Sequence, residues 1–137
     1  MQCRKLYLEA PSRTQDLLTT KWTLYGKGYT ITSTWHEDPR AGLGAFEGHW
    51  SADRLDEMRQ SDALVVLAGQ PNDNLSLAAM AGIALAHGMR VIWIGPLVEV
   101  LRHQSKLQHF RTAAEFHRLE VTSPEWPFAR LAMAQAA

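Results

Sequence analysis

The clearest pattern in the chain spans residues 61–96, where apolar and polar stretches alternate. Residues 63–68 (ALVVLA) form an unbroken apolar run, which is typical of a parallel strand covered on both faces. The stretch 69–74 (GQPNDN) gathers turn-forming residues, and 90–94 (RVIWI) is a second apolar run. The pattern predicts a β-α-β unit with two parallel strands joined by a right-handed crossover.

The helix of this unit is predicted to begin near Leu75 and to end before Gly88. Asn74 or Ser76 is suited to cap its first turn, and Gly88 to adopt a left-handed C-terminal cap. Small and apolar residues recur at helical spacing and predict the face that packs on the sheet: Leu75, Ala78, Ala79, Gly82, Ile83 and Ala86.

The N-terminal half continues the alternation of strands and helices. It predicts a strand over 5–10, a helix over 12–25 with Ser12 as N-cap, a strand over 29–34 and a helix over 51–60. The residues predicted to face the sheet are Leu17, Leu18, Trp22 and Tyr25 in the first helix, and Leu55 and Met58 in the second.

The C-terminal part predicts a short helix over 97–101, an edge strand over 107–110 and a helix over 112–119. Together these elements predict an α/β, three-layer Rossmann/flavodoxin-like sandwich with about five mostly parallel strands. We assign residues 1–120 to this domain and residues 121–137 to a C-terminal tail, a candidate for packing on a neighbouring subunit.

Composition narrows the classes of function. The 137 residues suit one domain, 46% of them are hydrophobic, and the formal net charge is zero. No global basic field recruits nucleic acid or anionic lipid, and no apolar run is long enough for a membrane span or a signal peptide. We therefore expect a soluble, cytoplasmic protein with no nucleic-acid or membrane partner.

The common cofactor and metal motifs do not occur in the sequence. There is one cysteine, Cys3, and the six histidines show no HExxH or comparable ligand spacing. The patterns GxGxxG, GxxxxGK[ST] and GxSxG are also missing. Their absence argues against a dinucleotide-binding protein, a P-loop nucleotide hydrolase and an α/β-hydrolase, respectively. We expect no metal and no cofactor.

The candidate site consists of polar and aromatic residues near the carboxyl ends of the predicted strands, where ligands bind in such sheets. A buried carboxylate at Glu9 is costly unless it is paired, by Arg13 or another nearby base, or exposed in a cleft. Trp35 is either a stacking surface for a base or a lid over the core. These candidates are Tyr7, Glu9, Ser12, Arg13, Trp35, Asp53, Asn72, Asp73, Asn74 and Ser76.

Several segments together resemble the nucleoside 2-deoxyribosyltransferase family, especially its short phage and bacterial members. They are LYLEAPSR (6–13), GYTITSTW (28–35), SDALVVL (61–67), AGIALAHG (81–88), RVIWIGP (90–96) and QHFRTAAEF (108–116). The resemblance implies the α/β fold predicted above. It also implies a homo-oligomer, because family members commonly share sites between subunits.

The family enzymes cleave the bond between a base and a deoxyribose through a glutamate nucleophile. The resemblance places Met80 at that position, two residues before Gly82, and a thioether cannot form the glycosyl ester. The family aspartate that serves the base falls on Asn74, with Asp73 beside it.

Two further positions follow from the resemblance. The family aspartate that contacts the sugar falls on Asp53 or Arg54, although an acid in the first turn of a helix is also common for electrostatic reasons. Tyr7 matches an aromatic residue of the family's first strand.

Three functions remain open at this point. The first is a nucleoside- or nucleotide-binding protein without the usual catalysis, whose pocket includes Tyr7, Trp35, Met80 and the loop 69–76. In that reading, N–H groups near Asn74 receive a phosphate or other anion.

The second is an N-glycoside hydrolase or deoxyribosyltransferase with a relocated carboxylate, either Glu9, Asp73 or Glu47. The third is a protein-interaction module that presents aromatic anchors. Its anchors are expected to be exposed side chains at Trp50, Trp126 and Phe128.

Overall fold

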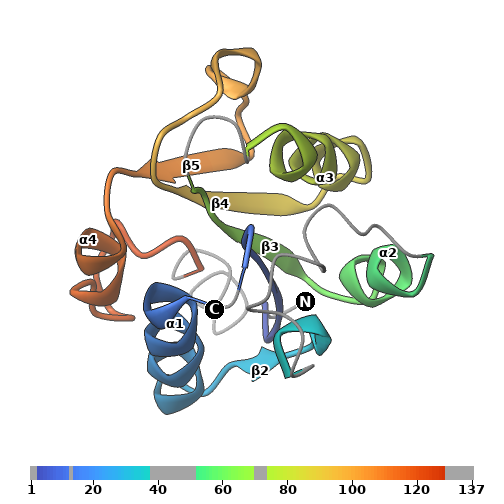
Figure 1. The fold of residues 1–137 in the computed structure, drawn as a ribbon. Helices are drawn as coiled ribbons and strands as arrows, with labels where there is room; N and C mark the ends of the chain where they lie inside the picture. The colour runs from blue at the N-terminus through green and yellow to red at the C-terminus, as the bar shows by residue number, and fades with distance from the viewer. Residues whose placement is uncertain (1–2, 13, 38–51, 70–73, 129–137) are drawn as a thin grey trace.

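The computed structural model describes residues 3–12, 14–37, 52–69 and 74–128, and the structural statements below concern these residues. They form one five-stranded parallel sheet in the order β2-β1-β3-β4-β5 (Figure 1). The strands are β1 (Lys5–Glu9), β2 (Thr30–Ile31), β3 (Ala63–Leu67), β4 (Arg90–Ile94) and β5 (Leu107–Phe110).

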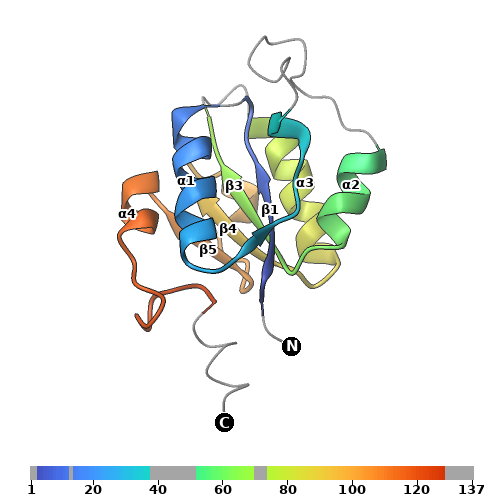
Figure 2. The same cartoon turned by 90° about the horizontal axis from the view of Figure 1, so that it is seen from below.

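Helices cover both faces of the sheet, which confirms the predicted three-layer α/β architecture. The helices are α1 (Gln15–Gly26), α2 (Ala52–Arg59), α3 (Asn74–Ala86) and α4 (Ala113–His117). Figure 2 shows α1 and α4 on one face and α2 and α3 on the other. All residues of β3 are buried, which explains why its sequence is continuously apolar rather than alternating.

β2 is shorter than the predicted strand 29–34. The backbone N–H of Thr32 still donates to the Leu6 carbonyl (2.9 Å). Beyond Thr32, side chains form the hydrogen bonds along the edge of β1: the Leu8 N–H donates to Ser33 Oγ (3.1 Å), and Trp35 Nε1 donates to the Leu8 carbonyl (2.8 Å). The chain then turns into a 3₁₀ helix, Trp35–Glu37. The backbone of β1 is thus satisfied without a longer partner strand.

The prediction for α1 was wrong in its N-cap and in most of its buried face, of which Leu17 alone is confirmed as fully buried. Thr14, rather than Ser12, caps the helix by accepting the Leu17 N–H on its Oγ1 (3.2 Å). The face toward the sheet carries Leu17, Thr20 and Leu24. Trp22 and Tyr25 are 65% and 42% exposed, and Leu18 is only half-buried, because a helix that buries positions 17, 20 and 24 turns position 22 outward.

The predicted face of α3 was also wrong. Leu75 is 81% exposed, and Ala79 and Ala86 are exposed as well. The helix is apolar on every side, so periodicity alone could not select the face that meets the sheet. The buried residues are Asn74, Leu77, Met80, Ala81 and Ala84.

Other element boundaries agree more closely with the predictions. β4 and β5 have the predicted bounds, Met58 is buried, and Gly88 has the expected positive φ of 78°. The predicted short helix 97–101 is a 3₁₀ turn, Glu99–Leu101, and the last helix is limited to Ala113–His117.

The segment that follows α4 packs against α4 and the residues before β2 in the same chain. Trp126 and Phe128 are 2% and 1% exposed, so the expectation that they are exposed interaction anchors was wrong. The Trp126 ring stacks on Phe116 with centroids 5.2 Å apart, and its Nε1 donates to the Tyr29 hydroxyl (2.9 Å). Trp50 and residues 129–137 lie outside the described residues.

Among the helices that the structure describes, none combines the length and apolarity that a membrane crossing requires.

Replacing Trp126 with alanine should lower the free energy of unfolding by about 3–5 kcal/mol, because it leaves a cavity in a buried aromatic cluster. Trp22→Ala is the matched control. This ring is 65% exposed and contacts Tyr25 and Lys21 on the protein surface, so the loss of unfolding free energy should stay below about 1 kcal/mol. Urea unfolding measures both, and equal losses would contradict the described packing.

Candidate functional site

The sheet order places a topological switch point between β1 and β3. From β1 the chain crosses through α1 to β2 on one side, and from β3 it crosses through α3 to β4 on the other. The two helices cover opposite faces of the sheet (Figure 2). The connections therefore diverge beyond the carboxyl ends of β1 and β3, where sheets of this type bind ligands.

A cleft of about 430 Å³ lies at this switch point, on the side of α1. Its polar side chains are Ser12, Thr14 and Asp16, at the start of α1. Of the predicted site residues that the structure describes, Ser12 alone lines it. The full lining is Pro11, Ser12, Thr14, Asp16, Leu67, Ala68, Gly69 and Pro96.

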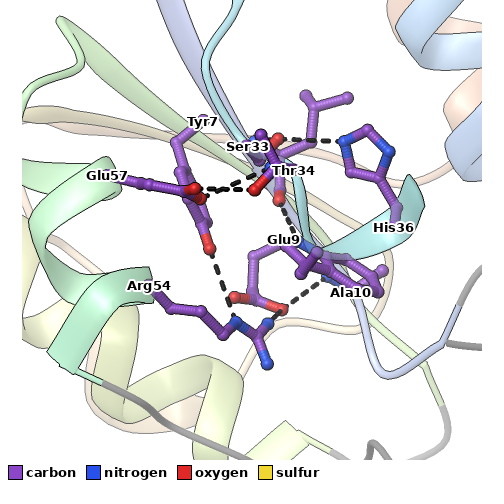
Figure 3. A network of polar contacts seen from close by, with 10 residues as sticks. Tyr7, Glu9, Ala10, Ser33, Thr34, His36, Arg54 and Glu57 are labelled. Atoms are coloured by element: carbon purple, nitrogen blue, oxygen red, sulfur yellow. Dashed lines mark hydrogen bonds and ion pairs between the residues drawn. The ribbon is translucent and has the colours of Figure 1, made fainter. Parts of the chain in front are cut away.

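A buried polar cluster lies at the same end of β1, on the opposite face of the sheet. Figure 3 shows Tyr7 and Glu9 from β1 and Arg54 from α2 pointing toward one another. Arg54 forms an ion pair with Glu9 Oε1, which also accepts the Ala10 N–H (3.2 Å). Glu9 is 3% exposed and Arg54 9%. Glu9 was expected to pair with Arg13 or another nearby base. In the structure that base is Arg54, and Arg13 lies outside the described residues.

Two aromatic residues fix the guanidinium of Arg54. Its Nε donates to the Tyr7 hydroxyl (3.5 Å), and its central carbon lies 5.0 Å from the centroid of the Trp35 ring, a cation–π contact. Trp35 is itself 6% exposed, so within the described structure it covers the core, as the lid interpretation expects, and does not stand in an open pocket.

The two oxygens of Glu9 have different surroundings. Oε1 is held by Arg54 and Ala10, whereas Oε2 is buried and has no hydrogen-bond partner in the described part of the chain. Burial raises the pKa of Glu9 to about 7, and the charge and hydrogen bond of Arg54 only partly oppose this effect. Glu9 therefore changes protonation near neutral pH.

The other members of the cluster respond to the same burial. Burial is the main reason why the pKa of Tyr7 is raised, and the carboxylate of Glu9 adds to it. Burial also lowers the pKa of Arg54, but Glu9 and Tyr7 more than compensate, so the net shift is upward and the guanidinium stays charged.

An outer set of hydrogen bonds holds the turn after β2 against this cluster (Figure 3). Ser33 Oγ lies 3.1 Å from His36 Nε2, and the Thr34 hydroxyl donates to Glu57 Oε1 (2.6 Å). Because Glu57 and Arg54 both belong to α2, these bonds set the position of that helix relative to β1.

The remaining predicted residues take other positions. Asn74 is buried, and its Oδ1 accepts the Gly69 N–H (3.1 Å), so it closes the loop after β3. Met80 is fully buried in the core, and Ser76 is half-buried on α3. The side chain of Asp53 is not described, and Arg13, Glu47, Asn72 and Asp73 lie outside the described residues.

Sequence reasoning did not single out Asp16 or Thr14, and it named Arg54 only as an alternative to Asp53 in the resemblance, not as the partner of Glu9. Arg54 had a usable signal, because a buried glutamate requires a cation and the helix that precedes β3 carries only Arg54 and Arg59. Asp16 and Thr14 had none, since a threonine and an aspartate at the start of a helix are common whatever the function.

Comparison of the chain with protein-family models, curated proteins and solved structures finds no match. Within the described ranges, no group of three or more histidine, cysteine, aspartate or glutamate side chains is placed to hold a metal ion.

The Glu9 carboxyl group should make stability fall as the pH rises. Its pKa is about 7 in the folded protein against an ordinary 4.5, so between these values the folded state binds a proton that the unfolded state has released. The free energy of unfolding of the wild type, relative to Glu9→Gln, should decrease by up to ~3 kcal/mol from about pH 4.5 to about pH 7. Urea titrations at several pH values measure this difference.

Two arginine variants test the cause of the effect. Arg54→Met removes the group that opposes the rise of the Glu9 pKa, so the decrease in stability should move to higher pH. Arg59→Met breaks an exposed ion pair with Asp56 on the same helix and should leave the pH range unchanged. An unchanged range in Arg54→Met would contradict the assignment.

Proposed function

We propose that this chain is a nucleoside- or nucleotide-binding protein that binds its ligand at the carboxyl edge of β1 and β3 and lacks the usual deoxyribosyltransferase catalysis. The observation that carries the proposal is the cleft of about 430 Å³ at the switch point. Its volume falls within the roughly 300–1,000 Å³ of small-molecule sites. The hydroxyl groups of Ser12 and Thr14 and the carboxylate of Asp16 suit the hydroxyl groups of a sugar.

Two features support the absence of the usual catalysis. The position that the resemblance assigns to the nucleophile is Met80, which has no ionisable group and is fully buried. Asn74, at the position of a second family carboxylate, is occupied by its hydrogen bond from Gly69. Both side chains act in packing and loop closure.

A second candidate function is N-glycoside hydrolysis with Glu9 as the catalytic carboxylate. The observation that favours it is the Oε2 atom of Glu9, which has no partner among the described residues, on a group with a pKa of about 7. A general base is most effective when its pKa is near the working pH. In this reaction Glu9 would take a proton from the water that attacks the anomeric carbon. The bond between that carbon and the nucleobase would break, and the nucleobase would leave with the proton that Glu9 gives up.

Binding should be detected as thermal stabilisation by deoxynucleosides, nucleotides or ADP-ribose-type compounds. A ligand at 100 times its dissociation constant should add roughly 2.7 kcal/mol to the free energy of unfolding. Ser12→Phe, which places a ring in the cleft, should abolish the shift, whereas Ser105→Phe in the exposed loop before β5 should not. The absence of any shift, or equal shifts in both variants, would count against this cleft as the binding site.

Chromatography of the same mixtures separates the two candidate functions. A binding protein should stabilise on ligand addition without releasing base. If Glu9 is catalytic, the wild type should release base and Glu9→Gln should lose at least about a hundredfold in rate, the lower end of a general acid–base contribution. Base release that survives in Glu9→Gln would remove Glu9 from the catalytic role.

A further inference from the structure

We propose that Asp16 makes the cleft select against phosphate, so that the ligand group next to the start of α1 is an uncharged sugar hydroxyl. This inference rests on the nucleoside binding proposed above and narrows it to unphosphorylated ligands. It makes Asp16 a specificity-determining residue.

The first observation is the position of Asp16. It lies in the first turn of α1, two residues after the N-cap Thr14, and lines the cleft. Among the residues described as lining the cleft it is the charged one, and within the described structure no ion pair neutralises it. Among the described lining residues, Asp16 therefore contributes a negative charge at the point where the helix meets the cleft.

The second observation concerns two backbone N–H groups near the cleft that would otherwise suit a phosphate. The Gly69 N–H, at the end of β3, already donates to Asn74 Oδ1 (3.1 Å). The Leu17 N–H, in the first turn of α1, already donates to Thr14 Oγ1 (3.2 Å). Backbone N–H groups at such loops and helix starts are the usual phosphate ligands, and here these two are occupied.

The electrostatics of α1 lead to the same conclusion. The positive end of a helix dipole attracts anions, but the carboxylate of Asp16 already occupies this end. A phosphate placed in the cleft would be repelled by that carboxylate. A sugar hydroxyl can instead donate to Asp16 and exchange hydrogen bonds with the hydroxyl of Ser12, which also lines the cleft.

The test compares the four deoxynucleosides with their 5′-monophosphates by isothermal titration calorimetry at low ionic strength. The wild type should bind the best nucleoside about tenfold or more tightly than its monophosphate. In Asp16→Asn, which keeps the size and removes the charge, the monophosphate should gain about tenfold, or about 1.4 kcal/mol, while the nucleoside changes little. The preference of the wild type should also shrink as salt is added, since salt screens exposed charges.

Glu120→Gln is the matched control, because it changes the net charge equally at the other end of the molecule. Glu120 is exposed and follows Leu119, whose carbonyl accepts a hydrogen bond from Lys27, just beyond the far end of α1. This variant should keep the wild-type preference, and far-UV circular dichroism confirms that both variants are folded.

Three results would overturn the inference. The first is a wild type that binds the monophosphate as tightly as the nucleoside, and the second is an unchanged preference in Asp16→Asn. In both cases binding itself is observed, so the proposed function stands while the role of Asp16 fails. The third is no binding of any deoxynucleoside or monophosphate, which overturns the inference and limits the proposed function to the other nucleotides in the thermal-shift screen.

Discussion

The parallel pairing of β1 with β3 is the constraint on which the rest of the structure depends. Residues Leu6 to Glu9 pair in register with Ala63 to Val66, which brings the carboxyl ends of the two strands side by side. Their connecting helices leave on opposite faces of the sheet, so the loops diverge at this edge. The cleft on one face and the Glu9–Arg54 pair on the other are both consequences of this geometry.

Burying the Glu9–Arg54 pair carries a desolvation penalty that lowers the stability of the folded domain. Removing two charges from water costs free energy that their attraction rarely repays in full, and here one carboxylate oxygen has no partner in the described structure. A pair of apolar residues would fill the same space with less cost. The pair lies at the carboxyl end of β1, next to the switch point between β1 and β3.

The sequence resemblance to nucleoside 2-deoxyribosyltransferases assigns roles to two positions, Met80 and Asn74, whose surroundings the structure describes. In the described structure Met80 is buried in the core, and Asn74 closes the loop after β3 by accepting the Gly69 N–H. The same fold can lose or change its chemistry without rearranging its sheet, since the sheet depends on apolar strands and the chemistry on a few side chains at the strand ends.

The sequence by itself determined the strands and the parallel sheet, because apolar runs and turn residues are local signals. It also indicated that Glu9 needed a partner. The tertiary structure alone decided that the partner is Arg54, that Trp126 packs on Phe116, and that α3 turns Met80 inward and Leu75 outward. These outcomes join residues far apart in the chain or choose between equally apolar helix faces, and only the packing of the whole domain makes that choice.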